Sequence, residues 1–174
     1  VIRYITIAST GNAIDFGDIA ETKWGLTKGS VASPTRGIFA GGSAFSPIKS
    51  NRIEYVTIAS TGNATNFGDM TTNTSGNGSC SSSTRGVFTI ANGDIDYLTI
   101  ASSGNSVDFG GGVVTRSNSA SSNNIRAVFA GGYITNIMSY VTIATTGDAI
   151  DFGDLNTVNR WNTAGCSNGH GGLQ

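Results

Sequence analysis

One sequence motif occurs four times along the chain and divides it into similar units. Each copy begins at a Tyr, continues through Thr-Ile-Ala to a Gly-Asn or Gly-Asp pair, and places a Phe-Gly pair twelve residues after the Tyr. The copies begin at Tyr4, Tyr55, Tyr97 and Tyr140, and their Phe residues are Phe16, Phe67, Phe109 and Phe152. The mean interval of about 45 residues is typical of propellers, solenoids and other repeat arrays.

A second motif lies between the copies of the first. It reads Arg-Gly-Ile-Phe-Ala-Gly-Gly from Arg36, and shorter or altered copies begin at Arg85 and Arg126. An Asp follows the Phe-Gly pair in three units, at Asp18, Asp69 and Asp154, and Gly111 replaces it in the third unit. Because Arg and Asp recur once per unit, we expect the Arg to bind a carboxylate or a carbonyl oxygen between neighbouring units.

The repeated segments indicate β-strands. Residues 55–60 alternate apolar and polar side chains, and the Thr-Gly-Asn that follows is a typical turn sequence. The Phe-Gly segment and the Arg segment provide a second and a third strand, and the Ser/Asn/Gly tract at 78–83 leaves room for a fourth. No segment shows helical periodicity with caps, so we expect an all-β fold.

The composition is unusual for a folded domain. Of 174 residues, 25 are Gly, and with Ser, Thr and Asn they make 83, which is typical of a linker. However, hydrophobic residues make up 38% of the chain and the net charge is only -1, whereas disorder combines low hydrophobicity with high net charge. The composition therefore indicates a folded chain with a polar, weakly charged surface.

Several classes of function are disfavoured. Ten basic residues opposed by eleven acidic ones give no net attraction to nucleic acid. No apolar run approaches the roughly 20 residues of a membrane span. His170 is the only His, so no centre with several His ligands can form. We therefore predict no enzyme, no catalytic residue and no cofactor, with structural Ca²⁺ at the Asp-Phe-Gly-Asp segments 15–18 and 151–154 as the alternative.

The order of the motifs resembles the kelch repeat. A kelch unit has an apolar strand ending in Gly-Gly, then a strand centred on Tyr, then an aromatic residue followed by a small apolar one. Phe39-Ala40-Gly41-Gly42, Tyr55 and Phe67-Gly68-Asp69-Met70 follow that order, although Phe replaces the usual Trp and the Arg is displaced. The resemblance implies a β-propeller with about four blades of four antiparallel strands.

We expect a single domain over residues 1–174. The units are approximately 1–34, 35–83, 84–124 and 125–169, and residues 170–174 are a remnant of the strand that would complete the first blade. Two arrangements remain open, a closed four-bladed ring and an arc of a larger propeller. In both, neighbouring units stabilise one another, because one unit cannot bury both faces of its sheet.

The sequence of residues 57–69 and 83–88 also resembles repeats of bacteriophage tail-fibre and structural proteins. This resemblance implies a virion or extracellular module that binds a surface glycan or protein on a host cell, or neighbouring appendage subunits. Association of identical chains is a further expectation. The alternative is a bacterial kelch-like scaffold that binds other proteins.

Four residues outside the repeated positions are candidates for special roles. Trp24 and Trp161 lie in polar tracts after the Phe-Gly segments, where each is either a sugar-stacking platform or a filler at the blade edge. Cys80 and Cys166 occupy equivalent places, and we expect both to be small buried thiols. We expect the repeated Tyr and Phe residues to pack between the units.

Overall fold

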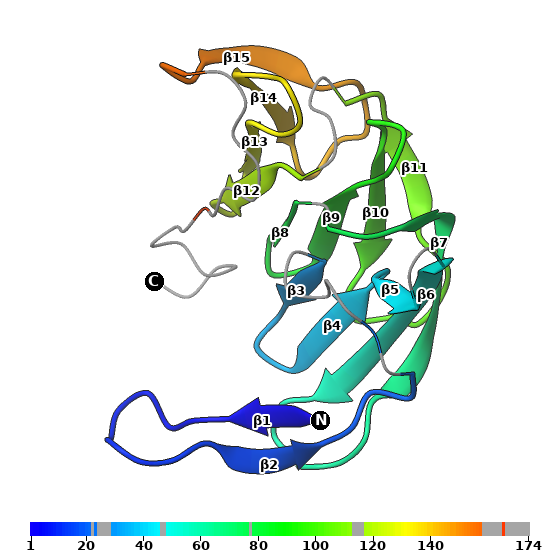
Figure 1. The fold of residues 1–174 in the computed structure, drawn as a ribbon, viewed down its shortest axis with the longest axis vertical. Coiled ribbons are helices and arrows are strands. Elements are labelled where there is room, and N and C mark those ends of the chain that lie inside the picture. The colour runs from blue at the N-terminus through cyan, green and yellow to red at the C-terminus, as the bar shows by residue number, and fades with distance from the viewer. Residues whose placement is uncertain are drawn as a thin grey trace.

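The computed structural model describes residues 1–21, 23, 29–45, 48–76, 78–112, 117–157 and 165. These residues form antiparallel β-sheets and no helix, which confirms the predicted all-β class (Figure 1). Consequently, this part of the chain contains no helix that could cross a membrane.

Four sheets follow one another along the chain. The first sheet contains β1 (Ile2–Tyr4) and β2 (Ile14–Gly17). The second contains β3 (Ser30–Ala32), β4 (Arg36–Ala40), β5 (Ser43–Phe45), β6 (Ile48–Thr57) and β7 (Thr65–Thr74). The third contains β8 (Ser79–Ser81), β9 (Arg85–Thr89), β10 (Ile95–Thr99) and β11 (Val107–Gly110). The fourth contains β12 (Ser119–Ser122), β13 (Arg126–Ala130), β14 (Ile137–Thr142) and β15 (Ile150–Asp154).

The second, third and fourth sheets share one pattern of pairing. A strand from the polar tract pairs with the Arg strand, which pairs with the Tyr strand, which pairs with the Phe strand. In the third sheet Tyr97 lies opposite Val87 on one side and Val107 on the other. Each of these three sheets begins one strand before the unit assigned from the sequence, because the polar tract pairs with the Arg strand that follows it. The difference concerns only where the repeat is divided, since a repeat can be divided at any point of its period.

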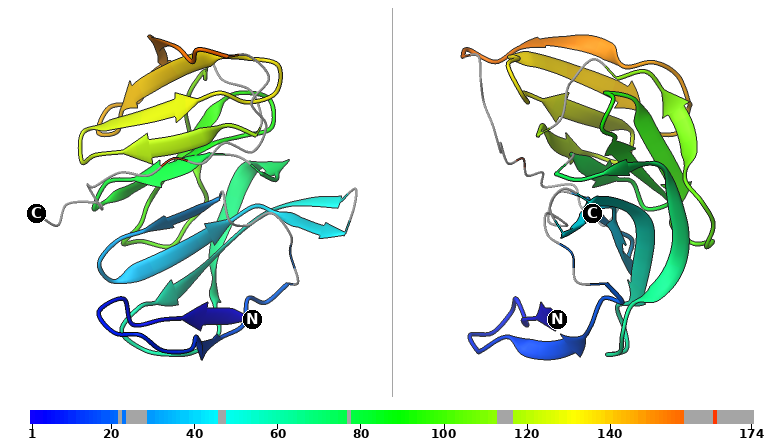
Figure 2. Two further views of the ribbon diagram at one scale, coloured as in Figure 1. Left: turned by 60° about the vertical axis from the view of Figure 1, so that its left-hand side comes forward. Right: turned by 45° about the vertical axis from the view of Figure 1, so that its right-hand side comes forward.

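The four sheets are arranged as an open arc. The first and fourth sheets lie at the two tips of this arc, with the second and third between them (Figure 1). Figure 2 shows the same separation of the tips from two further directions. The sheets of the described residues therefore do not close into a ring.

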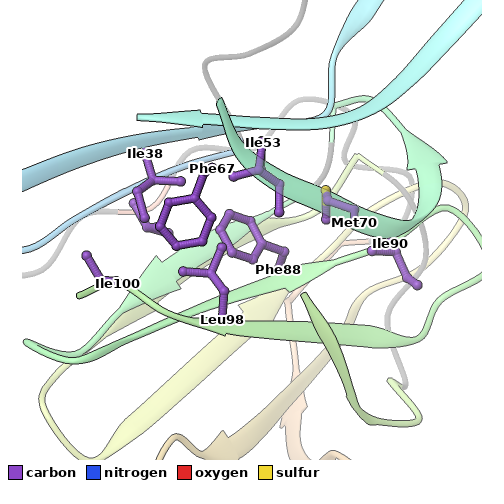
Figure 3. Close-up of a cluster of buried hydrophobic side chains, with 10 residues drawn as sticks. Ile38, Ile53, Phe67, Met70, Phe88, Ile90, Leu98 and Ile100 are labelled. Atoms are coloured by element: carbon purple, nitrogen blue, oxygen red, sulfur yellow. The ribbon is translucent and has the colours of Figure 1, made fainter. Parts of the chain in front are cut away.

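The hydrophobic core lies between successive sheets. One cluster joins the second and third sheets, and Figure 3 shows Ile38, Ile53 and Phe67 facing Leu98 and Ile100, with Phe88 among them. A second cluster joins the third and fourth sheets and includes Val87, Ile95, Phe109, Phe129 and Ile143. Adjacent residues Val87 and Phe88 belong to different clusters, since successive side chains of a strand point to opposite faces. The third sheet is thus buried on both faces.

The repeated aromatic residues differ in burial along the arc. Phe67 and Phe109 are buried between sheets, Phe16 is half-buried, and Phe152 is exposed. The Tyr residues of the second to fourth sheets are half-buried, and Tyr4 is exposed. Burial is therefore greater where another sheet covers that side, and it differs among copies that have similar local sequences.

Candidate functional site

A hydrogen-bonded clamp joins each sheet to the next. At the first junction the Gly62 N–H donates to the Phe16 carbonyl at 2.7 Å, and the Ala64 N–H donates to the Asp18 carbonyl at 2.8 Å. The Asp18 N–H in turn donates to Asn63 Oδ1 at 3.0 Å. Equivalent bonds use Phe67, Asp69, Gly104, Asn105 and Ser106 at the second junction, and Phe109, Gly111, Gly147, Asp148 and Ala149 at the third.

The glycine of the Phe-Gly pair makes this close approach possible. Gly68 has φ +155°, and a Cβ atom there would lie 2.3 Å from the Gly104 carbonyl oxygen. Gly17 would meet Gly62 at the same distance at the first junction. A side chain at either position would therefore force the two sheets apart, which explains the glycine after Phe16 and Phe67.

The repeated Arg binds carbonyl oxygens of the following sheet. Arg36 Nη1 donates to the Ile100 carbonyl at 3.1 Å, and Arg85 Nη1 donates to the carbonyls of Ile143 and Ala144 at 3.0 and 2.9 Å. Of the two partners considered from the sequence, the carbonyl is the one present at these junctions. The repeated Asp contributes its backbone to the clamp, and the Asp18 carboxylate lies 3.2 Å from the amino group of Val1.

Each Arg also lies over the Tyr of its own sheet. The Arg36 guanidinium carbon is 4.5 Å from the ring centre of Tyr55, and the Tyr55 ring meets Phe67 edge to face at 5.9 Å. Equivalent stacks are formed in the third sheet by Arg85, Tyr97 and Phe109, and in the fourth sheet by Arg126, Tyr140 and Phe152. In the first sheet the described residues form the edge-to-face pair of Tyr4 and Phe16 without an Arg. Since cation–π and edge-to-face contacts orient the side chains, the stack holds the Arg toward the next sheet.

Two buried acids, which the sequence analysis did not single out, form another link between sheets. Asp96 precedes Tyr97 and accepts hydrogen bonds from Ser106 Oγ at 2.6 Å and from the backbone N–H and hydroxyl of Thr71 in the preceding sheet. Glu54 precedes Tyr55 and accepts one from the Ala20 N–H at 3.1 Å. The sequence feature that indicates this link is an acidic residue immediately before the repeated Tyr in the second and third units.

Glu54 also belongs to a charge cluster in which Glu54 and Lys23 are buried and Arg52 and Glu21 are partly exposed. Its carboxylate lies 3.4 Å from Arg52 Nε and 3.8 Å from Lys23 Nζ, and Glu21 contacts both cations. The Lys23 side chain is fully buried, and this burial lowers the pKa of its ammonium group, although the Glu54 and Glu21 carboxylates oppose the shift. With two cations and two carboxylates, the cluster is balanced in charge and anchors β6 to the chain that follows the first sheet.

A small pocket opens at the rim between the second and third sheets. It has a volume of about 160 Å³, and Phe67, Tyr97 and the turn at 102–105 line it. The turn provides the hydroxyls of Ser102 and Ser103 and the amide of Asn105, of which the amide oxygen is already bound to the Asp69 N–H. The pocket thus combines aromatic walls with uncharged polar groups.

The residues predicted to carry special roles are only partly described. Trp24, Trp161, Cys166, His170 and the segment 170–174 lie outside the described residues. Cys80 is a free, buried thiol as predicted, and burial raises its pKa to about 12.

The Asp-Phe-Gly-Asp segments use a carboxylate locally. Asp15 Oδ1 accepts a hydrogen bond from the Gly17 N–H, and Asp151 Oδ1 accepts one from the Gly153 N–H. In the ranges that the structure describes, no group of three or more His, Cys, Asp or Glu residues could hold a metal ion.

Comparison of the chain with models of known protein families gives no match, and comparison with curated proteins gives none.

Proposed function

We propose that this chain is a non-enzymatic binding or structural module of a phage-type fibre or other extracellular appendage, and that it recognises a surface glycan. In this proposal the sheets are blades of a kelch-like propeller arc. The observation that carries glycan recognition is the rim pocket, where Phe67 and Tyr97 stand beside the polar turn at 102–105.

The chemistry of the pocket suits a neutral sugar. Sugars present apolar C–H faces, which pack on aromatic rings, and hydroxyls, which exchange hydrogen bonds with Ser and Asn side chains. Tyr97, which is half-buried, provides the aromatic surface, and Ser102 and Ser103 provide hydroxyls. Phe67 also lines the pocket but is only 3% exposed. The turn is exposed and is held on a rigid sheet by the clamp at Asn105, which supports binding by preorganisation.

A glycan array with a pocket-blocking variant tests this proposal. Ser103→Phe places a bulky side chain at the exposed turn and leaves the clamp residues unchanged, so we expect at least about tenfold weaker sugar binding. Thr146→Phe is the matched control, because Thr146 is the exposed residue at the equivalent position of the fourth unit. Absence of sugar binding by the unmodified chain, or equal binding by Ser103→Phe, would refute the pocket as the site.

The two Trp residues are tested separately. Trp24→Ala/Trp161→Ala measures whether the predicted stacking platforms contribute to the same binding. If the double variant loses sugar binding while Ser103→Phe binds sugar fully, the Trp residues rather than the rim pocket form the binding site.

A protein-binding scaffold is the second candidate, and a specific surface feature favours it. Ile14, Val107 and Ile150 occupy the same position of their Phe strands, and all three are more than half exposed. Exposed apolar side chains at this row of equivalent positions, where the second sheet has Thr65, suit a protein partner. If charged substitutions along this row abolish capture of a protein from host-cell envelopes, while sugar binding is absent, the scaffold function is favoured.

A further inference from the structure

The two tips of the arc expose apolar positions that are buried at the second and third junctions. On the face toward the preceding sheet, Ile100 and Ile143 are each 1% exposed, whereas the equivalent Ile7 of the first sheet is 95% exposed. On the opposite face, Phe67 is 3% exposed and Phe152 of the fourth sheet is 49% exposed. The tips therefore carry the two halves of an apolar contact that the chain buries at its second and third junctions.

Ile7 and Phe152 are more exposed than every equivalent residue at an inner junction. Val107 belongs to an inner sheet, yet it is as exposed as Ile14 and Ile150 of the first and fourth sheets. That position is exposed regardless of its neighbours. Ile7 and Phe152, in contrast, occupy positions that are buried at the second and third junctions and partly covered at the first, where Ile58 is 46% exposed and Phe16 is half-buried.

The polar half of the junction is also duplicated at the tips. Gly11, Asn12 and Ala13 repeat the Gly62-Asn63-Ala64 segment that binds the preceding sheet at the first junction. Phe152 and Asp154 repeat the strand positions that this segment binds. Among the described residues, neither tip makes the clamp hydrogen bonds.

The Arg of the fourth sheet fits the same pattern. Arg126 is stacked over Tyr140 like its counterparts, with 4.3 Å between the guanidinium carbon and the ring centre. It is exposed, whereas Arg36 and Arg85 are half-buried against the carbonyls of the next sheet. Arg126 is therefore oriented toward a sheet that would follow the fourth.

We propose that two copies of this chain associate head to tail, with the fourth sheet of one copy packed on the first sheet of the other. The two tips of a single arc lie at its opposite ends (Figure 1), so their halves cannot meet while the three inner junctions are kept. The hydrogen-bonded clamp of such an interface is already present three times within the chain, and its buried apolar contact twice. Because the two halves differ, the association is heterologous, and two arcs facing each other form two such junctions.

The contacts of the new junction follow from the inner ones. The Gly11 N–H donates to the Phe152 carbonyl of the other copy, and the Ala13 N–H donates to its Asp154 carbonyl. The Asp154 N–H donates to Asn12 Oδ1, and Arg126 donates to the Ile7 carbonyl. Ile7 then covers Phe152, as Ile100 covers Phe67 within the chain.

Sedimentation velocity over a range of concentrations tests the association. We expect the full chain to reach about twice its mass of 17.8 kDa, and a mass that stays at 17.8 kDa at high concentration would overturn the proposal. Ile7→Asp should shift the association to at least about tenfold higher concentration without unfolding the chain, since Ile7 is already solvated. Val107→Asp is the matched control, exposed but distant from the tips, and should associate as the unmodified chain does.

A mixture of two variants tests the head-to-tail arrangement. Ile7→Asp disables the first tip and Phe152→Asp disables the fourth, so each variant alone should stay monomeric, with folding checked by circular dichroism. Mixed together, they retain one intact junction between the fourth sheet of the first variant and the first sheet of the second. Formation of a mixed dimer supports the proposal, and its absence, when the unmodified chain is dimeric, refutes it.

Discussion

The Gly68 α-carbon faces the carbonyl oxygen of Gly104 so closely that a Cβ atom on Gly68 would lie 2.3 Å from it. These glycines come from different sheets, and the hydrogen bond from the Gly104 N–H to the Phe67 carbonyl holds them together at 2.8 Å. The relationship recurs at the junctions on either side, where Gly17 meets Gly62 and Gly110 meets Gly147. Contact between sheets is thus made by backbone as well as by side chains.

Gly68→Ala should destabilise the fold strongly. The added methyl group clashes with backbone, and φ +155° is unfavourable for any L side chain. We expect a loss of at least about 2 kcal/mol in the free energy of unfolding, measured by urea denaturation. Gly104→Ala is the matched control, since its Cβ atom would meet nothing within 4 Å, and it should change stability by less than about 0.5 kcal/mol. Equal effects of the two substitutions would contradict the close approach.

Equivalent Phe residues should differ in their contribution to stability. Phe67→Ala removes a ring buried between two sheets and should lower the free energy of unfolding by about 3–5 kcal/mol. Phe152→Ala removes a ring that is 49% exposed, so its effect should be about half as large or less in dilute solution. Thermal and urea unfolding of both variants measure the difference. Similar losses at the two positions would show that burial between sheets does not determine the contribution.

The Arg contact between sheets can be separated from the charge. Arg85→Lys keeps the charge but loses the planar group that binds two carbonyls and covers Tyr97, and should cost about 1–2 kcal/mol of stability. Arg126→Lys, at the exposed equivalent in the fourth sheet, should cost less than about 0.5 kcal/mol. Denaturation of the two variants side by side gives the comparison, and an unchanged Arg85→Lys protein would exclude the contact as a stabilising one.

Asp96 should be essential for joining the second and third sheets. Asp96→Ala leaves the Thr71 N–H and the Ser106 hydroxyl without their acceptor at a buried place, which should lower stability by about 3 kcal/mol or more. Asp94→Ala provides the control, because Asp94 is half-buried and its carboxylate accepts an exposed hydrogen bond from Asn92 within its own loop. Hydrogen exchange at the Thr71 amide should increase in the first variant only, and an unchanged rate there would contradict the role of Asp96.

The buried thiol makes stability depend on alkaline pH. Burial raises the pKa of Cys80 from its ordinary value of 9.0 to about 12, so the folded protein retains a proton that the unfolded chain loses. The stabilisation is therefore complete below about pH 9 and is lost as the pH rises toward about 12. The free energy of unfolding of the unmodified chain should fall more steeply over this range than that of Cys80→Ala. Parallel slopes would exclude this contribution from Cys80.

The local pattern of the sequence was sufficient for the repeated strands, although it did not predict β5 of the second sheet. The alternation around Tyr55, the turn after it and the distance to Phe67 predicted a hairpin, which β6 and β7 form. The polar tract at 78–83 was expected to leave room for a fourth strand, and β8 lies there. These features depend on neighbours along the chain, so the sequence carries enough information about them.

The contacts between sheets were harder to predict. The repeated Arg indicated a tie between units, but whether a carboxylate or a carbonyl would accept it was undecided, because either satisfies a guanidinium. The clamp made by Asn63 was missed, since Gly-Asn was interpreted only as a turn. Asp96 was missed because its donor Thr71 belongs to another unit and becomes a neighbour only after the sheets stack.

The sequence by itself therefore determined the all-β class, the period of the repeat and which side chains recur at equivalent places. The tertiary structure decided which of those equivalent residues are buried, because Phe67 and Phe152 have the same local surroundings and differ only in whether another sheet covers them. It also decided that the arc is open, since closure depends on the angle between successive sheets, and that angle is set by contacts such as Gly68 with Gly104 rather than by any single strand.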